Sequence, residues 1–114
     1  METINRTAFV ITPNQAFLEW MHRADPTNSE LTLEDARADA SVLLVPEAES
    51  EEEALSYLKR HCDKIFEEQL GAWYTVESTW PARRDFETFK EWFDWSFHSV
   101  IFDVGDEPIV HEEF

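Results

Sequence analysis

Apolar residues recur along this chain with two different spacings. Between Ala54 and Trp73 they recur every three or four positions, which places them on one face of a helix. Residues 6–12 and 41–45 are instead short runs rich in apolar and β-branched side chains, and such runs favour strands. The pattern predicts an α/β protein in which strands alternate with helices.

Capping residues mark where the helices begin. Thr12-Pro13-Asn14-Gln15 predicts a helix that opens at the proline and stops before Asp25-Pro26. Thr32 predicts the cap of a short second helix. Ser50-Glu51-Glu52-Glu53 is a capping box for a long helix, and Gly71 stands where its C-cap is expected.

The last third of the chain is rich in aromatic residues. Asp85 is predicted to cap a helix that runs to Phe97 and is followed by a strand over residues 99–104. On such a helix Trp92 and Trp95 lie away from the phenylalanine stripe. They are either covered by the aromatic loop 72–82 or exposed as anchors for a partner, since tryptophan is enriched at binding hot spots.

The order of elements is therefore β-α-(α)-β-α-α-β. Helical crossovers favour parallel pairing of the strands that they connect. We expect a small three-stranded sheet, mainly parallel, with helices packed on it, and a mixed sheet is the alternative. Residues 1–104 would form one domain and residues 105–114 a short acidic tail.

Negative charge is concentrated in two segments. The chain has 25 acidic and 9 basic residues, for a net charge of −16. Residues 24–58 contain ten acids and one arginine, and residues 91–114 contain seven acids and no base. Together these segments hold the whole excess, because residues 1–23 and 59–90 are each neutral.

In a parallel sheet the acidic stretches after the second and third strands would meet at one edge, where open α/β sheets place binding sites. This predicts an acidic docking surface for a basic protein. The simpler interpretation is that carboxylates favour helix N-termini and that a flexible tail tolerates charge. The candidate binding residues are Glu47, Glu49, Glu51, Glu52, Asp103, Asp106 and Glu107, with Trp92 and Trp95 as aromatic anchors.

The same charge makes other partners unfavourable. Nucleic acid is a poor direct partner because its backbone requires a basic surface. No apolar run approaches the length of a membrane span, and the amino terminus lacks an export signal, which predicts a cytoplasmic protein. Cys62, the single cysteine, falls on the apolar stripe of a helix and is expected to be buried.

No pattern points to a catalytic, metal or cofactor site. The four histidines lack the spacing of zinc ligands, and a glycine-rich phosphate loop is missing from the sequence. The first alternative to a docking protein is a small enzyme with carboxylates and His61 or His98 at the sheet edge, with or without a divalent ion. The second is a self-associating protein, such as a homodimer, that uses Trp92 and Trp95.

A set of short motifs is shared with other proteins. The motifs are Leu44-Val45-Pro46-Glu47, Glu51-Glu52-Glu53-Ala54-Leu55, Trp73-Tyr74-Thr75, Glu77-Ser78, Trp80-Pro81, Glu91-Trp92-Phe93 and His98-Ser99. In these the chain resembles a widespread group of short, acidic, functionally uncharacterised bacterial proteins. Trp95-Ser96 departs from that group, whose members carry smaller or acidic residues there. The resemblance implies a bacterial cytosolic protein and no particular activity.

Overall fold

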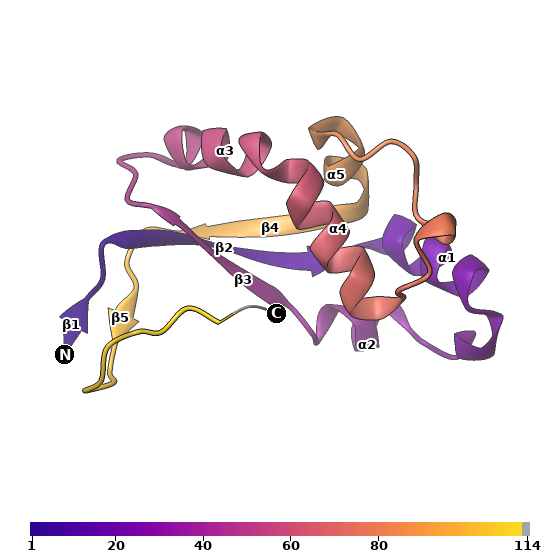
Figure 1. Ribbon diagram of the computed structural model, residues 1–114, viewed down its shortest axis with the longest axis horizontal. Helices are drawn as coiled ribbons and strands as arrows, with labels where there is room; N and C mark the ends of the chain where they lie inside the picture. The colour runs from indigo at the N-terminus through magenta and orange to yellow at the C-terminus, as the bar shows by residue number, and fades with distance from the viewer. Residues whose placement is uncertain (113–114) are drawn as a thin grey trace.

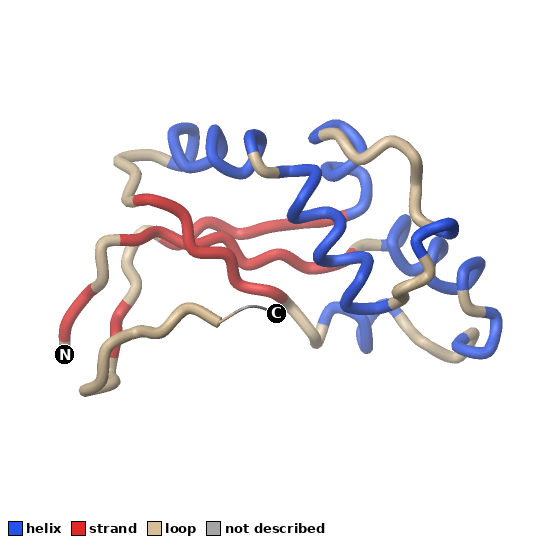
Figure 2. Tube along the Cα trace, viewed as in Figure 1, coloured by secondary structure: helices blue, strands red, loops and turns tan. Residues whose placement is uncertain are grey.

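The computed structural model describes residues 1–112 and shows helices packed on a small twisted sheet (Figures 1 and 2). Glu113, part of the predicted acidic tail, lies outside the described residues. The elements in chain order are β1 (Glu2–Thr3), β2 (Arg6–Pro13), α1 (Gln15–Ala24), a 3₁₀ turn (Pro26–Asn28), α2 (Leu33–Arg37), β3 (Ser41–Pro46), α3 (Glu51–Arg60), α4 (Cys62–Trp73), a second 3₁₀ turn (Glu77–Thr79), α5 (Phe86–Trp92), β4 (Phe93–His98) and β5 (Phe102–Asp103).

The α/β class is confirmed, but the prediction of a mainly parallel sheet is wrong. The main sheet has the order β3-β2-β4, and both outer strands run antiparallel to β2. The mixed-sheet alternative fails as well. Helical connections need not produce parallel neighbours. The connection through α1 and α2 joins the antiparallel neighbours β2 and β3, whereas the connection through α3, α4 and α5 joins β3 to β4, which run in the same direction but are separated by β2. A separate two-stranded ribbon pairs β1 with β5, also antiparallel.

The third long strand is Phe93–His98 rather than the predicted 99–104. The helix that was expected to reach Phe97 ends at Trp92, and the chain goes directly into β4. Phe93, Trp95 and Phe97 alternate with polar residues, so an extended chain turns all three rings to the core. A helix would have turned the ring of Trp95 away from it.

Helix boundaries differ from the prediction at two other places. The long helix is interrupted at His61, which caps both α3 and α4, and Gly71 lies inside α4 rather than at its end. Asn14 replaces Thr12 as the cap of α1, because the strand β2 continues through Pro13. Thr32 and Ser50 cap their helices as expected. The reciprocal capping box forms at Thr32 with Asp35, whereas the Glu53 carboxylate accepts from the Glu49 amide and not from that of Ser50.

The core lies between one face of the sheet and the helices. Phe9 and Ile11 of β2 and Phe93 of β4 pack against Phe17 of α1 and Phe66 of α4, all essentially inaccessible to solvent. Helices α3, α4 and α5 lie over this face, whereas α1 and α2 lie at the end where β2 finishes (Figure 1). In the described part of the chain every helix is too short or too polar to cross a membrane.

Candidate functional site

The first acidic stretch follows the end of β3. Pro46 ends the strand, and residues 47–49 lead into the cap of α3 at Ser50, whose hydroxyl accepts a hydrogen bond from the Glu53 amide at 3.1 Å. Glu53 in turn accepts a bond from the Glu49 amide at 3.0 Å. These bonds fix the loop and leave other carboxylates free. A surface hollow of about 600 Å³ is lined by Glu47, Ala48, Glu49 and Glu53.

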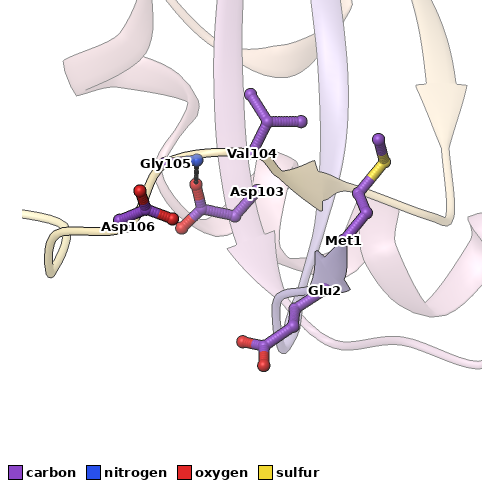
Figure 3. Close-up of a pocket in the computed structure, with 6 residues that line it drawn as sticks. All are labelled: Met1, Glu2, Asp103, Val104, Gly105 and Asp106. Carbon is purple, nitrogen blue, oxygen red and sulfur yellow. Dashed lines mark hydrogen bonds between the residues drawn. The ribbon is translucent and has the colours of Figure 1, made fainter.

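The second acidic stretch belongs to the β1–β5 ribbon. Asp103 accepts a hydrogen bond from the Gly105 amide at 2.8 Å, which turns the chain and brings Asp106 next to it (Figure 3). Glu2 lies directly opposite Asp103 in the ribbon. The residues Met1, Glu2, Asp103, Val104, Gly105 and Asp106 line a hollow of about 480 Å³. The sequence analysis missed Glu2, because two-residue strands have no detectable periodicity.

Both stretches lie at the same end of the long axis of the molecule, on opposite sides of the sheet (Figure 1). Strands β3 and β4 are both antiparallel to β2, so their carboxyl ends coincide although neither is parallel to its neighbour. The strand register limits the distance between the two stretches. Arg6 pairs with Pro46, and Glu2 pairs with Asp103. The path from Pro46 to Asp103 therefore consists of one strand spacing to Arg6, four residues of chain back to Glu2, and one more strand spacing. Even if these four residues are fully extended, the Cα atoms of Pro46 and Asp103 lie within about 24 Å of each other.

The carboxylates at this end have no basic partners. The ion pairs of residues 1–112 join Arg37 to Asp94, Arg83 to Asp85, Arg84 to Glu67 and Lys90 to Glu87. None of the seven candidate carboxylates takes part in them. Six of the seven are exposed, and Asp103 is half-buried. This end of the described chain therefore carries uncompensated negative charge, whereas several bases elsewhere are already paired.

The two tryptophans proposed as anchors are part of the core instead. The ring of Trp92 lies 5.5 Å from that of Phe66 and 5.9 Å from that of Trp20, measured between centroids. The ring of Trp95 lies 5.6 Å from that of Phe86 and faces the helices from β4. Both are half-buried. Both remain partly accessible, and neither lines the acidic hollows.

The residues suggested for an enzyme do not come together. His61 is exposed between α3 and α4, and His98 is exposed at the end of β4, where its ring nitrogen is hydrogen-bonded to the Ser96 hydroxyl at 2.8 Å. The hollow at Asp103 contains no histidine. Among residues 1–112 no group of three or more histidine, cysteine or acidic side chains is arranged to hold a metal ion.

Cys62 is buried, as predicted, and its environment disfavours the thiolate. Only 3% of the residue is exposed, and burial, with the nearby Asp63 and Asp85 carboxylates, raises the pKa of the thiol to about 11. A nucleophilic cysteine needs a lowered pKa and an accessible sulfur atom. The thiol has neither property.

A further acidic hollow lies on the helix side. It has a volume of about 350 Å³ and combines three glutamates with one face of the Trp80 ring; the lining residues are Glu67, Glu68, Gly71, Ala72, Glu77 and Trp80. The carboxylate of Glu67 is paired with Arg84 at 3.3 Å, so this hollow is partly neutralised. The described residues at the end formed by Glu47–Glu52 and Asp103–Glu107, termed here the acidic end, are not neutralised in this way.

Comparison with known proteins adds no relative, because no family model, no curated protein and no solved structure matches this chain. The resemblance to short acidic bacterial proteins accordingly stays a prediction, and functional inference rests on the site alone.

Proposed function

We propose that this protein is a non-enzymatic binding protein that docks its acidic end on a basic surface of another protein. The observation that carries this proposal is that unpaired carboxylates from two distant segments lie at one end of the molecule. An interface of ordinary size covers about 800 Å² on each partner, which is a disc about 32 Å across. The Cα atoms of Pro46 and Asp103, where the two stretches begin, lie within about 24 Å of each other, so both stretches can contribute to it.

The expected partner is a protein that itself binds or cleaves nucleic acid, because such proteins present dense basic surfaces. An inhibitor of that class would compete with the nucleic acid for the same basic residues. Complementary charge would mainly raise the rate of association, and this gain would decrease as salt screens the two surfaces. The comparison with known inhibitors of such proteins is an analogy of role, and the fold by itself does not support it.

A charge-neutralised variant tests the proposal. In one variant Glu47, Glu49, Glu51 and Glu52 are all replaced by glutamine; in the matched control the same change is made at Glu19, Glu68, Glu77 and Glu91, four exposed glutamates outside the acidic end. Both variants lose four negative charges. Circular dichroism first establishes that each is folded.

The measurement is capture of proteins from a bacterial lysate at low and at high salt. The wild type and the control should retain the same basic protein at low salt and release it at high salt, and the acidic-end variant should not retain it. An equal loss of capture by both variants would show that only net charge matters. Loss by the control alone would move the docking site to the hollow at Trp80. Either result, or the lack of any salt-sensitive partner, contradicts the proposal.

A further inference from the structure

The second face of the main sheet lies away from α3, α4 and α5, and half of its ten residues are apolar. Within residues 1–112, nine large hydrophobic side chains are strongly exposed, and only Val76 among them belongs to the helix side. The others come from β3, from Met1 and from residues 100–110, which run along the uncovered side of the sheet (Figure 1). Val42 is 62% exposed and Leu44 is 48% exposed. Contiguous apolar surface of this kind marks interaction sites in soluble proteins.

This open face is defined by the alternate residues of the three strands. They are Arg6, Ala8, Val10 and Thr12 of β2, Val42, Leu44 and Pro46 of β3, and Asp94, Ser96 and His98 of β4. Residues directly opposite each other in neighbouring strands share a face of the sheet. The residues that alternate with them along each strand point to the other face and fill the core. Ala8 is the single buried member, since its small side chain lies between Leu44 and His98.

The open face has one unpaired charge, that of Arg6, although the chain carries −16. Its one carboxylate, Asp94, is paired with Arg37 at 2.7 Å. The side chains of Ser96 and His98 are hydrogen-bonded to each other, and the Arg6 guanidinium donates to the Asn5 carbonyl at 2.8 Å. Because the polar groups of this face are mostly hydrogen-bonded within the chain, a partner needs to supply little complementary charge. The face can therefore pack against an identical surface.

We propose that the open face is the interface of a homodimer, in which two copies pack their sheets face to face about a two-fold axis. Only one acidic residue, Asp94, lies on the three strands of the open face, so these strands are where two copies can approach with the least repulsion. Two-fold pairing places the same patch on both subunits, as a self-complementary surface requires. The tryptophans considered from the sequence take no part.

The size of the interface determines which segments must contribute. Three strands spaced about 4.8 Å apart and six residues long, at about 3.4 Å per residue, cover only about 300 Å². A standard interface needs about 800 Å² per subunit. The β1–β5 ribbon and the segment after it must supply the difference. The strongly exposed apolar side chains there are Met1 at 88%, Phe102 at 59%, Val104 at 77%, Ile109 at 57% and Val110 at 74%.

That contribution gives the dimer a distinctive salt dependence. The same segment carries Asp103, Asp106, Glu107 and Glu112, so association brings like charges together. Salt screens this repulsion, with a Debye length of about 10 Å at 0.1 M and about 3 Å at 1 M. Dimerisation should therefore strengthen with salt, whereas docking on a basic partner should weaken. The opposite signs separate a failure of this inference from a failure of the proposed function.

The test is sedimentation equilibrium of the full chain over a concentration series, at about 20 mM and about 500 mM NaCl. The wild type should dimerise, more tightly at the higher salt. Val42→Asp should raise the dissociation constant on the order of a hundredfold, because the two-fold axis places the lost apolar contact and the added charge in the interface twice. Val76→Asp is the matched control. It adds the same charge to a similarly exposed valine on the helix side and should dimerise as the wild type does.

A second variant covers the case in which aspartate disturbs the strand. Replacing Val42 and Leu44 together by threonine removes apolar surface and places β-branched side chains, which suit a strand, at both positions. It should fold as the wild type does and dimerise more weakly. A chain that is monomeric at every concentration and salt, or a dimer equally stable in all these variants, overturns the proposal.

Discussion

The two faces of the main sheet are built from the same strands and behave as opposite kinds of surface. The helix-covered face is filled by interlocking aromatic rings; Phe66, for example, contacts Phe89, Trp92 and Phe93 at centroid distances between 5.4 and 5.9 Å. The open face shows valine and leucine to solvent. Stability must come almost entirely from the first face, which leaves the second free to interact with another molecule.

The difference also explains where charge can accumulate. Acidic residues lie in the first turns of α2 and α3, and Asp35, for example, accepts a hydrogen bond from the amide of the N-cap Thr32 at 3.1 Å. Such positions favour carboxylates because the N-terminus of a helix is positive. The three strands of the open face provide no helix terminus, and one acid stands there. Charge therefore collects around the helices and at the acidic end.

The largest contrast is expected for truncation of one side chain on each face. Phe66→Ala should lower the free energy of unfolding by about 3–5 kcal/mol, because it leaves a cavity among buried rings. Leu44→Ala on the open face should change it by at most about 0.5 kcal/mol under conditions where the protein is monomeric. Urea unfolding of both variants at low salt measures the difference. Similar losses would mean that the open face is covered in the folded monomer.

A second, smaller contrast concerns the cap of α5. The Thr88 amide and hydroxyl donate to the Asp85 carboxylate, and Arg83 donates to it at 2.7 Å. The hydrogen bonds from the Thr88 amide and from the Arg83 guanidinium hold the pKa of Asp85 at about 2, below its usual value of 3.8. A lowered pKa stabilises the fold above about pH 4, and this contribution is lost as the pH falls from about 4 to about 2.

The variant Asp85→Asn keeps a capping side chain and removes the charge. Its melting temperature should lie a few degrees below that of the wild type at pH 7, and the difference should vanish near pH 2. Asp39→Asn serves as a control, since it removes one exposed charge without a cap and should not lower the melting temperature. If the difference in melting temperature between Asp85→Asn and the wild type persisted unchanged at pH 2, the charge of Asp85 would not be what stabilises α5.

The sequence predicted local features well and long-range pairing poorly. Ser50 and Thr32 were recognised as caps because their bonding partners lie three residues away. The direction of β3 relative to β2 depends on residues 30 or more positions apart, and no local pattern encodes it. At Phe93–His98 the spacing of phenylalanines fitted a helix as well as a strand. The alternation of Phe93, Trp95 and Phe97 was the signal that could have decided between them.

The same division holds for the candidate site. Its acidic residues could be chosen from charge alone, since the two segments contain the whole excess. Their meeting at one edge was predicted from parallel neighbouring strands, whereas in the structure it follows from β3 and β4 both running against β2. That pairing could not be chosen from the sequence, and Glu2 was missed and the tryptophans were misplaced for the same reason. Each depends on a contact between segments far apart in the chain.

The smallest expected effect sharpens the comparison most, because it separates stability from association. Arg37 donates to the Pro13 carbonyl at 3.1 Å and to Asp94 at 2.7 Å, and both charged side chains are about half exposed. Arg37→Ala should therefore cost only about 0.2–1 kcal/mol of stability in urea unfolding. It also leaves the Asp94 charge uncompensated on the open face, so dimerisation should weaken clearly. Arg83→Ala removes the same charge on the helix side and should leave dimerisation unchanged. If both variants weakened the dimer equally, net charge alone would govern association. The pairing of Asp94 with Arg37 on the open face would then have no role in dimerisation.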